Sequence, residues 1–277
     1  MPVAASWDWA RVEVAVPGAG VRLPGVAMAG FRQRVASAAE LAMVAHPSVT
    51  VLVDLSDDGA VVFESGGRRV RGSAVIGLLP GQVRAAGPGT GDCLQVRLEP
   101  AVAAAVLGGA AELSGSVVPL EEVWGHDAAR LRERLRAASS WQARFVVVAE
   151  LLARRLEAGP AVDAEVGHVW GRLLRSRGRL RVDGLAQEVG WSRQRLWSRF
   201  RAQVGLSPKR AARLVRFDRA ARLLAAGRPP AGVAAHAGYV DQSHLHREVR
   251  TFTGLTPAEV AAAPWLGIDE VAWPATP

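Results

Sequence analysis

The chain has 277 residues, which is long enough to bury a sizeable core and to form two domains. Its only cysteine, Cys93, excludes an intrachain disulfide and a zinc site built from cysteines. The net charge of +8 is uneven, because residues 1–164 carry −1 and residues 165–277 carry +9. Within the second part, residues 167–228 carry +13 and residues 229–277 carry −3. A basic block of this kind is typical of a surface that binds a polyanion.

No apolar run reaches the length of a membrane span, and the N-terminus lacks the basic and apolar regions of a signal peptide. We therefore expect a soluble, cytoplasmic protein without a membrane partner.

The first hundred residues predict a β-rich unit. Alternating or β-branched segments predict strands at residues 11–16, 49–55, 60–64, 74–79 and 93–98. Asp57-Asp58-Gly59 and Ser65-Gly66-Gly67 are turn signals on either side of the third of these. Several short strands at this spacing favour a small barrel or a sandwich.

A helical pattern begins at Pro100, since proline suits the first turn of a helix and an Ala/Val/Leu run follows it to Leu107. Residues 127–138 and 141–156 also show helical periodicity. Glu157-Ala158-Gly159-Pro160 then predicts a linker.

Two units with the same plan follow the linker. Each has a short apolar helix, a turn that contains glycine, a capping residue and a longer amphipathic helix. The first unit runs through residues 182–192 and 193–205, and the second through 233–241 and 242–254. This is the plan of a helix-turn-helix, which places its second helix in the major groove of DNA. The sequence therefore predicts two recognition helices, capped by Ser192 and Asp241.

Each predicted recognition helix has an inward apolar stripe and an outward polar face. The inward stripes are Leu196, Phe200 and Val204 in the first helix, and Leu245, Val249 and Phe252 in the second. The outward faces hold Gln194, Arg195, Ser198 and Arg201 with Trp197 at the edge, and Ser243, Arg247 and Arg250 with His244 to one side. Glutamine can pair with adenine and arginine with guanine.

A basic helix from Ser207-Pro208 to about Ala226 is predicted to join the two units. Its apolar stripe is Leu214, Phe217, Ala221 and Leu224, and its other positions include Lys209, Arg210, Arg213, Arg216, Arg219 and Arg222. Such a helix spans roughly 28 Å, close to the roughly 34 Å between successive major grooves on one face of DNA. Thr256-Pro257-Ala258-Glu259 then predicts a capping box that opens a last helix.

From about Asp163 to Pro264 the chain resembles the AraC/XylS family of bacterial transcription regulators. The matching residues of the first half are Leu185-Ala186, Gly190-Trp191-Ser192, Leu196, Phe200, Gly205-Leu206-Ser207-Pro208, Ala220 and Leu223-Leu224. Those of the second half are Gly238-Tyr239, Asp241-Gln242-Ser243-His244-Leu245, Arg247 and Gly254-Leu255-Thr256-Pro257. Val249 and Val260 depart from the aromatic residues that are common there in the family, and Ser198 departs from a frequent arginine.

The resemblance implies a sequence-specific DNA-binding regulator. It implies an α+β chain in which a β-rich domain with helices, a cupin-like barrel or sandwich, precedes an all-α domain of two helix-turn-helix units. We expect residues 1–158 to form an effector-sensing or dimerisation domain and residues 163–265 to form the DNA-binding domain. The expected partners are double-stranded DNA, RNA polymerase, a small-molecule effector and a second copy of the chain. No cofactor or metal is expected.

The outward faces and the resemblance together give the expected DNA contacts. The expected base contacts are Gln194, Trp197, Ser198, Arg201, Ser243, His244 and Arg247. The expected phosphate contacts are Arg193, Arg195, Arg210, Arg213, Arg216, Gln242 and Arg250.

Two other classes of function are less well supported. An enzyme fused to such a domain is disfavoured, because Cys93 cannot supply both a nucleophile and a zinc cluster, and no phosphate loop or nucleophile elbow appears. A non-specific architectural DNA-binding protein is the second alternative, and the polar recognition faces argue against it. Core packing is a more common role than a ligand pocket for Trp7, Trp9, Trp124 and Trp141.

Overall fold

The computed structural model describes residues 12–34, 39–56, 61–79, 82–87, 91–109, 111–262 and 272–273. The strands are β1 (Val12–Ala15), β2 (Val26–Gln33), β3 (Ala39–Met43), β4 (Val49–Asp54), β5 (Val62–Ser65), β6 (Arg68–Arg71), β7 (Ala74–Ile76), β8 (Val83–Gly87), β9 (Gly91–Leu98) and β10 (Val117–Pro119). The helices among and after them are the 3-10 helix η2 (Ala19–Val21), α1 (Pro100–Leu107), α2 (Leu120–Trp124), α3 (His126–Ala137) and α4 (Trp141–Ala158). We call this part the β domain.

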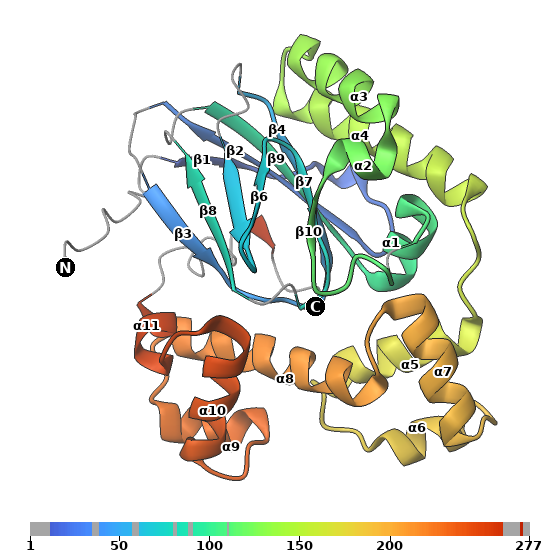
Figure 1. The fold of residues 1–277 in the computed structure, drawn as a ribbon, viewed down its shortest axis with the longest axis vertical. Coiled ribbons are helices and arrows are strands. Elements are labelled where there is room, and N and C mark those ends of the chain that lie inside the picture. The colour runs from blue at the N-terminus through green and yellow to red at the C-terminus, as the bar shows by residue number, and fades with distance from the viewer. Residues whose placement is uncertain are drawn as a thin grey trace.

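A helical domain follows the β domain (Figure 1). Its helices are α5 (Ala164–Arg175), α6 (Val182–Glu188), α7 (Arg193–Val204), α8 (Pro208–Ala225), α9 (Pro230–Ala237), α10 (Gln242–Thr253) and α11 (Pro257–Ala261). The order of the two domains confirms the predicted α+β fold. Helix α4 continues to Ala158, so Glu157 and Ala158 belong to that helix and not to the predicted linker, which is shifted to residues 159–163.

The strands form two antiparallel sheets, which is the arrangement of a sandwich. Sheet A has the strand order β1-β2-β9-β4-β7-β10, and sheet B has the order β3-β8-β5-β6. Strand β4 is buried along its whole length, because Val51 faces the core shared with the helices while Leu52 packs with Phe63 of sheet B. Burial of both faces explains why apolar residues occupy the consecutive positions 51–53 of this strand instead of alternating with polar ones.

The hairpin between β5 and β6 confirms the predicted turn after the third predicted strand. Ser65 pairs with Arg68, and the intervening Gly66 and Gly67 have φ angles of 56° and 81°. Two consecutive positive φ angles define a type I′ turn, which glycine adopts without steric cost. The other predicted turn, at residues 57–59, lies outside the described residues.

Helices α1–α4 pack on the face of sheet A that lies opposite sheet B (Figure 1). The ring of Trp141, at the start of α4, lies directly on Gly30 of β2, where a Cβ atom would come within 2.3 Å of it. Only glycine leaves room for this contact, and it places the first turn of α4 against the sheet.

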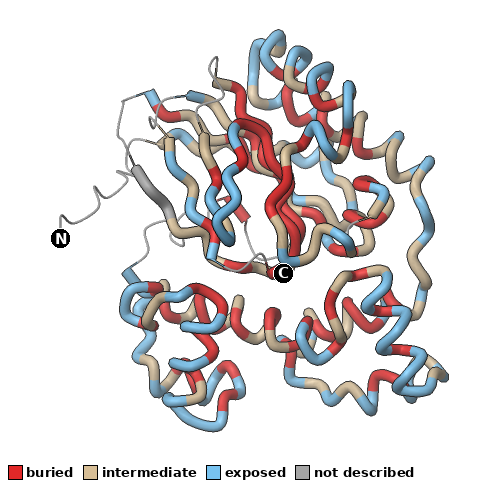
Figure 2. Tube along the Cα trace, viewed as in Figure 1, coloured by how far each residue is buried: buried red, intermediate tan, exposed pale blue. Residues whose placement is uncertain are grey.

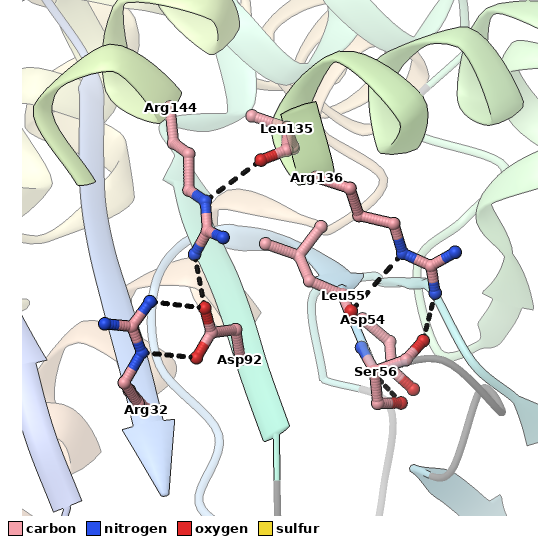
Figure 3. Close-up of polar contacts among 8 residues, drawn as sticks. All are labelled: Arg32, Asp54, Leu55, Ser56, Asp92, Leu135, Arg136 and Arg144. Atoms are coloured by element: carbon pink, nitrogen blue, oxygen red, sulfur yellow. Dashed lines mark hydrogen bonds and ion pairs between the residues drawn. The ribbon is translucent and has the colours of Figure 1, made fainter. Parts of the chain in front are cut away.

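A polar cluster fixes the same end of α4 (Figure 3). Asp92 of β9 accepts hydrogen bonds from Nε and Nη2 of Arg32 at 2.7 Å each, and from Nη1 of Arg144 at 2.5 Å. Burial raises the pKa of Asp92, but the hydrogen bonds and charges of Arg32 and Arg144 outweigh it and hold that pKa below its usual value. Arg144 also donates to the Leu135 carbonyl at 3.0 Å, which joins α3 to α4.

Helix α8 crosses beneath the β domain in the view of Figure 1, with α5–α7 near one end and α9–α11 near the other. It is buried or half-buried over most of its length (Figure 2). The β domain also reaches the helical domain directly, because α1 packs against α7.

Candidate DNA interface

The first helix-turn-helix has the predicted turn and cap. Gly190, with a φ angle of 66°, lies in the turn between α6 and α7. The Ser192 Oγ atom accepts a hydrogen bond from the backbone N–H of Arg195 at 3.1 Å, so it caps α7. Gly205 ends the helix in the left-handed conformation.

Helix α7 separates apolar from polar side chains. Leu196, Phe200 and Val204 are all buried, and Phe200 lies 6.4 Å from the ring of Trp170 on α5. The exposed side chains are Arg193, Gln194, Arg195, Trp197, Ser198, Arg199, Arg201 and Ala202. Because one stripe is anchored in the core, the other face is held rigidly toward solvent.

Trp197 belongs to the exposed face, although the helical-face prediction put it at the edge. Its exposed fraction is 48%, and the Arg201 guanidinium lies 5.1 Å from its ring. Arg195 lies 4.7 Å from the ring of Trp191. Two arginines are thus held against indole rings beside the polar face.

The second helix-turn-helix repeats this geometry. Gly238 follows α9 with a φ angle of 79°, and the Asp241 carboxylate accepts a hydrogen bond from the His244 N–H at 2.6 Å. Leu245, Val249 and Phe252 are buried as predicted. Val249 is fully buried although it is smaller than the aromatic residue expected from the resemblance.

The exposed face of α10 contains most of the predicted contacts. Gln242, Ser243, Arg247 and Arg250 are exposed. His244 is half-buried, and its ring meets the Tyr239 ring edge-on at 5.3 Å. The histidine is therefore held in one orientation by packing, with only part of its ring accessible.

Helix α8 fixes the two units relative to each other. It follows the capping residue Ser207 and contains 18 residues, which corresponds to roughly 27 Å. Its Phe217 stacks on Phe252 of α10 with ring centroids 4.7 Å apart. Arg210 near its start is exposed.

Two arginines of α8 are committed to contacts inside the second unit, which the sequence did not indicate. Arg213 donates from Nη2 and Nε to the carboxylate of Glu248, at 2.6 and 2.9 Å. Arg216 lies 5.5 Å from the ring of Tyr239. Both arginines were expected to contact phosphates. In Arg213, however, the Nε and Nη2 atoms already donate to Glu248 and are not free for a phosphate.

The burial of Glu248 and the contacts of Tyr239 were not predicted from the sequence. Glu248 lies beside the predicted inward stripe and is only 4% exposed, and a charged residue at such a position is a signal for a buried ion pair. Burial, and then the charge of Glu248, raise the pKa of the Tyr239 phenol well above its usual value. Among the described residues its hydroxyl has no hydrogen-bond partner.

The basic block is partly neutralised by nearby carboxylates. Arg172 pairs with Glu188 at 2.8 Å, Arg199 with Asp163 at 2.7 Å, and Arg222 with Asp218 at 3.1 Å. Glu188 and Asp218 are already included in the net charge of +13, whereas Asp163 and Glu248, the partners of Arg199 and Arg213, lie outside residues 167–228 and reduce the available positive charge further.

The β domain contacts both units at the ends of their second helices. A Cβ atom at Gly205 would come within 2.8 Å of the Ala111 carbonyl oxygen, and one at Gly254 within 1.9 Å of the Gln82 side chain. Helix-turn-helix proteins present the N-terminal residues of the second helix to base edges. The β domain therefore touches the ends of α7 and α10 that are farthest from such a contact.

Other candidate sites of the β domain have structural roles. Trp124 is buried and donates from Nε1 to the Val106 carbonyl at 3.2 Å, and Trp141 packs on Gly30, so both have packing roles. Trp7 and Trp9 lie outside the described residues. Burial, together with the charges of Asp54 and Asp92, raises the pKa of Cys93 to about 12, which keeps the thiol protonated and unreactive.

A small cavity lies beside β4 and β7. Its lining is Met43, Val44, Ala45, His46, Ser48, Thr50, Ile76 and Gly77, and its volume of about 20 Å³ has room for about one water molecule. Among the residues that the structure describes, no helix is both long enough and apolar enough to cross a membrane. Within the same residues, no three His, Cys, Asp or Glu side chains gather as metal ligands would.

Comparisons with known proteins agree with this geometry. Residues 185–263 match the helix-turn-helix domain family. A ligand-free point variant of ToxT from Vibrio cholerae has a similar fold, with a TM-score of 0.50 and 10% identity over 87% of this chain and 98% of that one. ToxT from Vibrio cholerae O395 aligns with 92% of this chain and 98% of its own, at 9% identity and a TM-score of 0.48.

An AraC-type transcriptional regulator from Chromobacterium violaceum aligns with 40% of this chain and 95% of its own, at 22% identity and a TM-score of 0.34. No curated protein matches the chain significantly. The similarity to the ToxT variant supports a β-rich domain followed by a helical domain.

Proposed function

We propose that the chain, a DNA-binding transcription regulator with an AraC-type helix-turn-helix domain at residues 185–263, places α7 and α10 in two successive major grooves of double-stranded DNA. The observation that carries this proposal is the pair of capped helices, each with a buried stripe and an exposed polar face. The length of α8, roughly 27 Å, is of the same order as the spacing of roughly 34 Å between successive major grooves.

The proposed base contacts lie in the first two turns or so of each recognition helix. They are Gln194, Trp197, Ser198 and Arg201 on α7, and Ser243, His244 and Arg247 on α10. Arg201 and Arg247 would recognise guanine, Gln194 adenine, and the exposed edge of Trp197 a thymine methyl group. Because His244 is half-buried against Tyr239, we expect it to make a single contact with a base, through the exposed side of its ring.

The proposed phosphate contacts are Arg193, Arg195, Arg210, Arg216, Gln242 and Arg250, with Arg213 in a secondary role. Arg213 holds α10 in place through Glu248, so its effect on DNA binding would come mainly from positioning the recognition helix. Arg216 adds charge close to the same helix and is half-buried against Tyr239.

The β domain is proposed to regulate the DNA-binding unit. In this proposal residues 1–158 sense a small molecule or form a homodimer, residues 163–265 bind DNA, and the bound protein contacts RNA polymerase. Contacts of the β domain with Gly205 and Gly254 support this role, because they join it to both recognition helices. The proposed domain has no catalytic step.

Salt dependence of DNA binding by the whole chain tests the central part of this proposal. Five or six arginine–phosphate contacts predict a slope of about −5 for log K against log salt concentration, measured by fluorescence anisotropy with a labelled duplex. A slope near zero, or no binding at low salt, would contradict the proposal. Equal affinity for a selected duplex and a random one would support the non-specific architectural alternative instead.

A further inference from the structure

The C-terminal segment returns to the β domain after the second helix-turn-helix. Ala272 and Trp273 are only 3% and 7% exposed, and they form a buried cluster with Ala29 of β2, next to Val14 of β1 and Phe31 of β2. The short red segment among the strands in Figure 1 is this part of the chain. A large apolar side chain from the far end of the sequence is thus buried against the first two strands.

The surface that Trp273 covers is the face of sheet A turned toward sheet B. On β2, Gly30 faces Trp141 of α4, and the alternation of a strand therefore directs Ala29 and Phe31 to the opposite side. Phe31 pairs across the ladder with Cys93, which packs with the cluster between the two sheets. Trp273 therefore occupies the inside of the sandwich.

The contact has the chemistry of an aromatic-binding surface. The Arg97 guanidinium, on β9, lies 4.2 Å from the centre of the Trp273 ring. A cation on one side and apolar side chains on the other recognise a flat, electron-rich ring. The cavity beside His46 is far too small for an organic molecule.

We propose that Trp273 is an intramolecular ligand of the β domain, seated on an aromatic-binding surface formed by Ala29, Phe31 and Arg97, and that small planar aromatic molecules of the indole class compete with it. Ten residue steps join Ala262 to Ala272 and can span at most roughly 35 Å, so the occupied surface ties the second helix-turn-helix to the β domain. Displacement of Trp273 would release this tie. The proposal goes beyond the DNA contacts proposed above and does not depend on them.

Alkylation of Cys93 in the whole chain provides the test, because Cys93 is the only cysteine and lies beside Phe31. We expect N-ethylmaleimide to label Trp273→Ala at least about tenfold faster than wild type, as followed by mass spectrometry. Trp273→Phe, which keeps a ring, should label at nearly the wild-type rate. Trp191→Ala, which removes a tryptophan from the helical domain, is the matched control and should leave the rate unchanged.

Free indole distinguishes a binding surface from simple core packing. Indole at millimolar concentration should slow the labelling of Trp273→Ala, because it fills the place of the missing ring. It should leave the wild-type rate unchanged, because the surface beside Cys93 stays covered whether Trp273 or indole occupies it. A wild-type labelling rate in Trp273→Ala would overturn the proposal. Fast labelling that indole does not slow would overturn it as well, since Trp273 would then only fill space.

A replacement variant covers the case in which Trp273→Ala does not fold, as judged by circular dichroism. Trp273→Leu keeps apolar volume without a planar ring. Faster labelling that indole suppresses would support the proposal in this variant too, and a wild-type rate would contradict it.

Discussion

Arg213 and Glu248 join the helix that connects the two units to the second recognition helix. The Glu248 carboxylate is 4% exposed and accepts hydrogen bonds from Nε and Nη2 of Arg213, while the Arg213 side chain remains 40% exposed. The orientation of α10 relative to α8 thus depends on a charge pair as well as on the stacking of Phe217 on Phe252.

Arg213→Ala should destabilise the helical domain, because it leaves the Glu248 carboxylate buried without its cation. Loss of one partner of a fully buried pair costs about 3–5 kcal/mol, and the partial exposure of Arg213 reduces our expected loss to about 2 kcal/mol. The thermal unfolding midpoint measures the effect. Replacing both residues with methionine should restore most of the stability, whereas an unchanged midpoint in Arg213→Ala would mean that water solvates Glu248.

His46 should make folding sensitive to mild acid. Burial, and then the charges of Arg97 and Arg222, lower the pKa of His46 well below its usual value. As the pH falls below about 6.5, His46 of the unfolded chain binds a proton, whereas His46 of the folded chain stays neutral. The contribution of this residue to the free energy of unfolding is therefore fully present above that pH and is lost as the pH decreases toward the folded pKa. His46→Gln should keep a side-chain partner for Thr50, which lies 3.1 Å from the His46 ring, and flatten the profile. Parallel curves of unfolding midpoint between pH 7.5 and 5.5 for the two proteins would disprove this role.

Arg210 and Arg247 are both exposed arginines, but we expect them to act differently. Arg210→Ala should weaken specific and random DNA alike and reduce the salt slope by about 1, because it removes one phosphate contact. Arg247→Ala should weaken the specific site alone, by about 1–3 kcal/mol. Anisotropy titrations with the two duplexes at several salt concentrations separate the roles, and equal losses on both duplexes for Arg247→Ala would make that residue a phosphate contact.

The cap of α10 should contribute to DNA binding through the order of the first helical turn. Asp241→Ala removes the acceptor for the His244 N–H and should cost about 1 kcal/mol of helix stability. Because Ser243 and His244 lie in that turn, affinity for specific DNA should fall with it. Asp241→Asn keeps an acceptor and should recover most of the affinity, and an equal loss in the two variants would indicate that the charge of Asp241 matters rather than its capping.

From residue 182 onward the helical domain followed from the sequence almost completely, because its signals are local, whereas α5 was not predicted. Caps at Ser192, Ser207, Asp241 and Thr256 all form as predicted, including the reciprocal capping box between Thr256 and Glu259. Stripes with helical spacing then identified the buried side of each helix. Contacts between helices could not be predicted, because no local sequence pattern indicates that Arg213 pairs with Glu248, which lies 35 residues away.

The β domain was only partly predicted. The predicted strands at residues 49–55 and 93–98 correspond to β4 and β9, which lie at the centre of sheet A and have strong apolar patterns. Strands β2, β3, β6, β8 and β10 were missed. Strand β2, for example, contains Gly30, whose role becomes clear only once Trp141 packs on it. The return of Trp273 to this domain is also a long-range event that no local pattern indicates.

Selection of binding sites from a random DNA pool by the whole chain is the most direct test of two recognition helices in successive grooves. We expect two preferred sequence blocks whose centres lie about 10 base pairs apart. Gln194→Ala should relax preference in one block only, and Arg247→Ala in the other only. A single block, or a loss of preference in both blocks from either substitution alone, would contradict the binding of α7 and α10 in two successive grooves.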